Sequence, residues 1–170
     1  MTTAQTDAPV LRLPVVTVIV LVLLAIVFAF EVRFAPVLQG GLSPPVGALI
    51  AYGAADGALV FGHGEWWRVF TAPMLHANLS HLLSNAAVFA IVGFMLEPLV
   101  GSRWFAALYA VGGLGGALCA LLLDPPDIPA VGASGAIMGV LGAAFLCGAS
   151  AKAGPKGRRM QSWSLRMMLP

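Results

Sequence analysis

The sequence predicts an all-α membrane protein, a polytopic helical bundle, and two observations carry that prediction. Apolar residues make up 59% of the 170 residues and charged residues only 9%, and the mean hydropathy is +0.93. Soluble domains carry about 25% charged residues, so the composition excludes an ordinary soluble domain. In addition, four stretches hold no Asp, Glu, Lys or Arg: 13–30, 73–96, 104–123 and 128–151. Each is close to the roughly 20 helical residues that cross a hydrocarbon core.

We therefore expect four spanning helices, at about 13–30, 79–97, 104–123 and 134–151. The first is apolar apart from Thr17 and is expected to be lipid-facing scaffold. A cleaved secretory signal is the alternative interpretation of this segment. Against it, the apolar run exceeds the usual signal core of about 7–15 residues, and the following FEVRF offers no small-x-small cleavage site.

The remaining segments are predicted to lie outside the spans. Residues 1–12 form a short polar tail, and residues 152–170 form a basic connection after the fourth span. Between them, the long loop 31–75 is expected to associate with the membrane, because Trp67 and its aromatic neighbours surround Arg68 as in an interfacial segment. An ordinary aromatic belt explains the same pattern equally well.

The distribution of charge predicts an orientation. Five basic residues follow the fourth span with no acid among them: Lys152, Lys156, Arg158, Arg159 and Arg166. The first and third connections instead hold the acids Asp56, Glu65, Asp124 and Asp127. The positive-inside rule therefore places both ends in the cytoplasm. No nucleic-acid partner is predicted, because the positive-inside rule already accounts for a basic cluster beside a membrane.

Polar residues inside spans are costly, which makes each one a candidate for function. His81 and Asn85 are four positions apart in the second span, and so lie on one face of a helix. Two neutral hydrogen-bond donors at a site of low dielectric suit the stabilisation of an oxyanion. The alternative is an interhelical hydrogen-bonded pair that only joins the bundle.

Ser134 begins the fourth span within the sequence VGASGAIMG. Gly132 and Gly135 flank it without side chains, so a substrate carbonyl could approach the hydroxyl near the N–H groups of the helix start. A plain helix cap is the alternative for this serine. The soluble hydrolase elbow G-x-S-x-G is not matched, because it requires glycine at Ala136.

Other features of the sequence carry less chemistry. His63, His76 and His81 match no zinc-ligand spacing, so neither a metal nor a cofactor is predicted. Cys119 and Cys147 lie within apolar spans and are interpreted as small core residues. The glycines of the third span are interpreted as packing positions, and the G-x-x-x-G pair Gly135–Gly139 predicts a central, tightly packed fourth span.

Four motifs follow one another along the chain. They are Trp67-Arg68, H-x-x-x-x-H-x-x-x-N at His76, His81 and Asn85, E-x-x-x-G-S-R from Glu97 to Arg103, and G-x-S-G from Gly132 to Gly135. This ordered set resembles the rhomboid family of intramembrane serine proteases over about residues 64–150. The resemblance implies a rhomboid-like bundle of which four of six transmembrane helices are present.

The resemblance also implies roles for these residues. Ser134 would be the nucleophile, with Gly132 and Gly135 shaping its loop, and His81 and Asn85 would hold the oxyanion with the Ser134 N–H. His76 would tie the start of the second span into the fold, and Trp67 and Arg68 would belong to the membrane-associated loop. The implied substrates are single-span membrane proteins, in the lipid bilayer of a bacterial plasma membrane with the N-terminus cytoplasmic.

One departure from the family pattern is important. Rhomboids carry their general base, a histidine, on the sixth span, and no such histidine follows here. A truncated rhomboid lacking its last two spans is the favoured interpretation. The alternatives are a non-catalytic rhomboid-like membrane protein that binds helical clients, and an unrelated transporter or scaffold, which must treat the motif order as coincidence.

Overall fold

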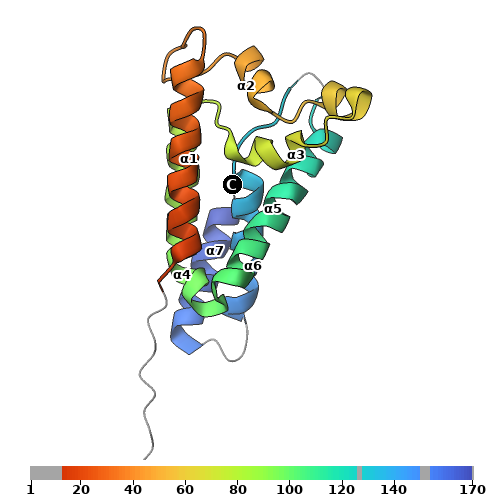
Figure 1. Ribbon diagram of the computed structural model, residues 1–170. Helices are drawn as coiled ribbons and strands as arrows, with labels where there is room; N and C mark the ends of the chain where they lie inside the picture. The colour runs from red at the N-terminus through yellow and green to blue at the C-terminus, as the bar shows by residue number, and fades with distance from the viewer. Residues whose placement is uncertain (1–12, 126–127, 150–153, 170) are drawn as a thin grey trace, which may run out of the picture.

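The computed structural model describes residues 13–125, 128–149 and 154–169, so the predicted tail at 1–12 lies outside the described residues. The predicted all-α membrane bundle is confirmed over these ranges, where only two isolated bridges show β pairing. Figure 1 shows the long helices side by side with the short ones gathered near one end. The helices are α1 (Val15–Phe34), α2 (Val46–Tyr52), α3 (Arg68–Thr71), α4 (Leu79–Val100), α5 (Ser102–Leu123), α6 (Ser134–Ala149) and α7 (Gly154–Met168), with a π-helical turn η1 (Ala58–Gly62) and a 3-10 turn η2 (Ala72–Met74).

Three helices, α1, α4 and α5, are long and apolar enough to cross a membrane. They have 20, 22 and 22 residues, whereas α6 has 16 and is short for a span over its described residues. The outward faces of the long helices are apolar, as Ile26, Phe94 and Val111 illustrate with exposures of 59%, 53% and 69%. Apolar side chains on the outside are those that lipid solvates, so the chain is an integral membrane protein.

The close crossing of α5 and α6 is built from glycines. A β-carbon at Gly116 would lie 2.5 Å from the Gly135 Cα, and one at Gly139 would lie 2.9 Å from the Gly112 Cα. Each backbone therefore occupies the space where a side chain of the other would stand. This contact fixes the start of α6, which carries Ser134, against the middle of α5.

A buried carboxylate joins α4 to the start of α1. Glu97 Oε1 accepts hydrogen bonds from the Val16 N–H at 2.9 Å and the Ser102 hydroxyl at 2.7 Å. Its Oε2 accepts from the Thr17 N–H at 2.8 Å and the Thr17 hydroxyl at 2.7 Å. The N-cap of α1, Pro14, supplies no side-chain cap of its own. Glu97 therefore acts as the cap from a neighbouring helix, where a negative charge is favoured.

The segment predicted as the basic connection 152–170 is helical over residues 154–168. Helix α7 returns along α6, with Met160 and Ser164 buried and Gly157 next to Gly148. The sequence predicts a basic connection here and leaves its secondary structure open. The helix forms because its small and apolar residues recur at helical spacing and face α6.

Candidate functional site

Ser134 is positioned by an extended segment that enters α6. Ala55 and Ala130 exchange backbone hydrogen bonds of 3.0 and 2.9 Å, and the Gly132 N–H then donates to the Ala72 carbonyl at 2.9 Å. Gly132 has a φ of +114°, which side-chain-bearing residues rarely adopt, and this turns the chain into the helix. Ser134 is consequently presented at the first residue of α6 with its side chain exposed.

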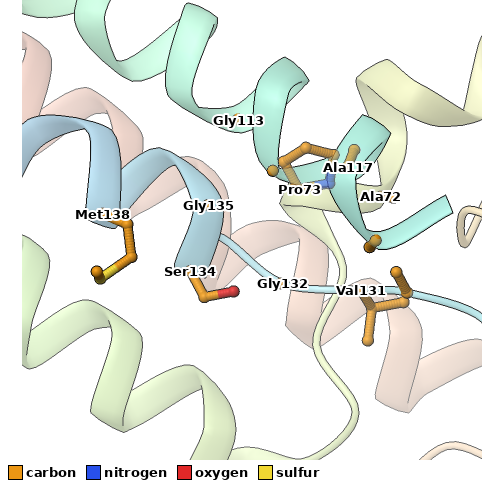
Figure 2. Close-up of a pocket in the computed structure, with 12 residues that line it drawn as sticks. Ala72, Pro73, Gly113, Ala117, Val131, Gly132, Ser134, Gly135 and Met138 are labelled. Carbon is orange, nitrogen blue, oxygen red and sulfur yellow. The ribbon is translucent and has the colours of Figure 1, made fainter. Parts of the chain in front are cut away.

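A cavity of about 210 Å³ opens beside Ser134. Figure 2 shows the hydroxyl projecting from the start of α6 next to Gly132. Small residues dominate the walls, so a polypeptide backbone could approach closely. The lining residues are Ala72, Pro73, Gly113, Gly116, Ala117, Ala120, Ala130, Val131, Gly132, Ser134, Gly135 and Met138.

His81 and Asn85 face the same loop from α4. Asn78 caps the start of the helix, where its side chain accepts a hydrogen bond from the His81 N–H at 2.8 Å. The His81 ring lies one helical turn before Asn85. A β-carbon built at Gly132 would lie 2.7 Å from His81 Cε1 and 3.4 Å from Asn85 Nδ2. Both side chains therefore press against the backbone two residues before Ser134, and Gly132 connects them to the cavity.

His76 lies behind this pair and is fully buried. Its Nε2 is 3.1 Å from Asn85 Nδ2, and its ring meets that of His81 edge to face at 5.1 Å. Burial lowers the pKa of His76, the neighbouring His81 lowers it further, and a backbone hydrogen bond to Met74 raises it in part, so that the pKa is about 4. At neutral pH the ring is therefore neutral, with one nitrogen a donor and the other an acceptor.

Glu31 belongs to this cluster although the sequence analysis assigned no role to it. It lies in α1, which extends to Phe34 rather than ending near residue 30, and its Oε2 accepts the His76 N–H at 3.2 Å. Its side chain is buried, with 1% of the residue exposed. The signal that could have found it is a single acid at the end of a charge-free apolar run, since such residues are functional candidates by default.

Trp67 and Arg68 do not line the cavity beside Ser134, and they support it indirectly. Arg68 is buried, binds Glu65 at 2.7 Å, and donates to the carbonyls of Ile50 and Ala54. Trp67 stacks on its guanidinium at 4.6 Å. These contacts fix α3 and the following turn η2, whose Ala72 and Pro73 line the cavity.

Comparison with known proteins identifies the family of this arrangement. A family model described as the Rhomboid domain matches residues 63–168, which include His76, His81, Asn85 and Ser134 but not Glu31 or Ala55. The chain belongs to the rhomboid family. No solved structure matches it.

Relatives of this rhomboid differ in what their names say about activity. It is 39% identical over 95 residues to Rhomboid protease GluP of Bacillus subtilis, covering 56% of this chain and 18% of that protein. It is also 39% identical over 102 residues to RHOMBOID-like protein 1 of Arabidopsis thaliana, covering 60% and 26%. Inactive RHOMBOID-like protein 8 of the same plant is 31% identical over 102 residues, covering 60% and 29%. The chain thus matches less than a third of the length of each of these relatives.

The site of this rhomboid suits acyl chemistry better than metal chemistry. Its donors are neutral side chains and backbone N–H groups at a helix start, which can stabilise negative charge on an oxygen. Within the described ranges, no three His, Cys, Asp or Glu side chains gather as metal ligands would. What the arrangement can do chemically therefore depends on the Ser134 hydroxyl and the donors around it.

Proposed function

We propose that this rhomboid carries the nucleophile and the oxyanion donors of an intramembrane serine endopeptidase. Ser134 attacks the substrate carbonyl, and His81, Asn85 and the Ser134 N–H hold the resulting oxyanion. The observation that carries the proposal is the contact of both His81 and Asn85 with Gly132, two residues before an exposed serine on a cavity. Such donors typically contribute about 10²–10³-fold each to turnover.

A serine also needs a general base to become a nucleophile. His76 does not suit this role, because it is buried and its Nε2 faces Asn85. His81 faces Gly132, and His63 is exposed on the loop that precedes α3. We therefore assign the base to a histidine outside these 170 residues, as the family resemblance implies. The genomic sequence downstream of residue 170 tests this assignment directly.

The proposed substrates are single-span membrane proteins whose helices unwind beside Ser134. Because small residues line the cavity, an unwound backbone can reach the hydroxyl. We further propose that the N-terminus of the chain faces the cytoplasm of a bacterial cell. A reporter fused to the N-terminus tests the orientation, and a periplasmic signal would contradict it.

The test of activity uses the full reading frame in membranes. A fluorophosphonate probe should label the protein, and Ser134→Ala should abolish labelling. Ser84→Ala is the matched control, because Ser84 is exposed on α4 and donates only to the His81 carbonyl. Equal labelling of wild type and Ser134→Ala would refute the assignment of the nucleophile.

A second function, the non-catalytic binding of helical clients, is favoured by one observation: the similar RHOMBOID-like protein 8 of Arabidopsis thaliana is named inactive. It predicts co-purification of single-span proteins without their cleavage, together with the absence of Ser134 labelling. Cleavage of a single-span protein that is lost in Ser134→Ala would exclude it as the sole function.

A further inference from the structure

Two buried polar atoms in the cluster behind Asn85 have no hydrogen-bond partner among the residues that the structure describes: Glu31 Oε1 and His76 Nδ1. Their residues are 1% and 0% exposed, so bulk solvent does not reach them. Leaving such a group unpaired destabilises the folded protein. Both belong to residues already joined, because Glu31 Oε2 accepts the His76 backbone N–H.

The hydrogen-bonding roles of the two atoms can be worked out from Asn85. Its Nδ2 can only donate, so the His76 Nε2 facing it at 3.1 Å must accept. A neutral imidazole that accepts at Nε2 carries its proton at Nδ1. The unpaired Nδ1 is therefore a donor, and Glu31 Oε1 is an acceptor beside the same residue when the carboxyl group is ionised.

We propose that Glu31 is a positioning residue, which accepts the Nδ1 proton of His76 directly or through one buried water and so fixes the tautomer that holds Asn85. The proposal rests on the role of Asn85 in the proposed function. In this arrangement the carboxylate of Glu31 in α1 influences the site through a hydrogen-bond chain that runs from His76 to Asn85. It does not touch the substrate.

The tautomer decides which end of the Asn85 amide faces the site. One N–H of Nδ2 is used by His76, and Nδ2 itself lies 3.4 Å from the β-carbon position of Gly132, so the other N–H is available there. With the proton on Nε2 instead, the amide rotates to offer Oδ1 to His76. A carbonyl oxygen then faces the loop before Ser134, where it repels an oxyanion instead of binding it.

The isosteric variant Glu31→Gln separates this role from simple packing. Its amide oxygen can still accept the His76 backbone N–H, but its NH₂ group then faces Nδ1 as a donor. The variant should therefore invert the tautomer while filling the same space. The Met74 backbone, which also hydrogen-bonds the His76 ring, is the competing acceptor. If Met74 and not Glu31 accepted the Nδ1 proton, the tautomer would be unchanged in Glu31→Gln.

Nitrogen-15 NMR of histidine-labelled protein in lipid bilayers reads the tautomer directly. The signals of His76 are identified by their loss in His76→Gln. The wild type should show His76 protonated at Nδ1, and Glu31→Gln should show it protonated at Nε2. The matched control is Glu97→Gln, a second buried carboxylate joining α1 and α4, which should leave His76 unchanged.

Two results would overturn the proposal: a wild type protonated at Nε2, or an unchanged tautomer in Glu31→Gln. The first needs no variant and decides the matter even if Glu31→Gln fails to fold. For turnover of the full reading frame, Glu31→Gln should lower kcat toward the level of Asn85→Ala, about 10²–10³-fold below wild type, with KM little changed. The double variant should be no slower than Asn85→Ala, and additive losses would contradict action through Asn85.

Failure of the proposed function gives a different pattern. If the His76 tautomer inverts in Glu31→Gln but the probe does not label Ser134, the Glu31–His76 interaction is supported. Its role in catalysis is then refuted. If the probe labels Ser134 but the His76 tautomer is the same in wild type and Glu31→Gln, the proposed protease function stands and the positioning role of Glu31 is refuted.

Discussion

Gly132 lies directly against His81, and the contact leaves no space for a side chain. A β-carbon at Gly132 would stand 2.7 Å from His81 Cε1 and 2.8 Å from Nε2, closer than such atoms approach in proteins. The glycine also has a φ of +114°. One residue therefore sets both the turn into α6 and the distance between the α4 donors and the loop before Ser134.

Gly132→Ala should consequently displace His81 and distort the Ser134 loop. A left-handed backbone costs a residue with a side chain about 1–2 kcal/mol, and the overlap with the imidazole adds to this. We expect serine-directed labelling of the full reading frame to fall at least about tenfold, in line with a donor moved from its place. Gly115→Ala is the control, because a β-carbon there meets nothing within 4 Å. Equal labelling in the two variants would contradict the contact.

Much of the fold follows from the sequence because lipid imposes simple rules. Long charge-free runs predict α4 and α5, and helical spacing alone places His81 and Asn85 on one face. The glycines of the third and fourth spans were predicted to pack, and they meet each other at the α5–α6 crossing. That Gly112 pairs with Gly139, and Gly116 with Gly135, depends on the tertiary arrangement of the helices and could not be predicted.

The parts that escaped prediction depend on partners distant in sequence. Glu31 follows an apolar run and was assigned to the loop, because nothing local shows that the His76 N–H lies 45 positions away. The segment of α7 was predicted only as a basic connection, because its basic residues dominate the sequence pattern. The side of α7 that packs on α6 becomes evident only in the folded structure. Glu97 was noticed as part of a motif, yet its role as the cap of α1 depends on Val16 and Thr17, which are 81 and 80 positions away.

Removing the Glu97 carboxylate should loosen α1 from α4. Glu97→Ala leaves the Thr17 N–H and hydroxyl without an acceptor, at about 1–3 kcal/mol for each buried donor. We expect a loss of at least about 2 kcal/mol in the free energy of unfolding, measured by denaturant titration in bicelles. Glu97→Gln keeps one acceptor oxygen and should lose less. Asp124→Asn, at an exposed position, should match wild type, and a loss there equal to that of Glu97→Ala would show a general effect of charge.

Widening the α5–α6 crossing should destabilise the bundle and impair the site together. In Gly116→Ala the new methyl group would lie 2.5 Å from the Gly135 Cα, a backbone atom that cannot rotate away. Overpacking of this kind costs about 1–3 kcal/mol, and here it also moves the residue next to Ser134. The unfolding free energy and Ser134 labelling should fall in parallel. Gly142→Ala, where a β-carbon meets nothing within 4 Å, should preserve both. Lowered stability with labelling intact would show that the crossing does not position Ser134.

Acid should destabilise the fold through His76. Its pKa is lowered from 6.5 to about 4 in the folded protein, chiefly by burial. Between these values the unfolded chain binds a proton that the folded chain does not, so the stability supplied by the neutral ring is complete above pH 6.5 and is lost as the pH falls toward 4. The loss should approach about 3 kcal/mol, because one pKa unit corresponds to roughly 1.4 kcal/mol. The unfolding free energy is measured in bicelles at pH 7 and pH 4.5 for wild type and for His76→Gln, and the difference between the two proteins should shrink by this amount at the lower pH. A pH dependence that is the same in His76→Gln would place the acid sensitivity on other groups.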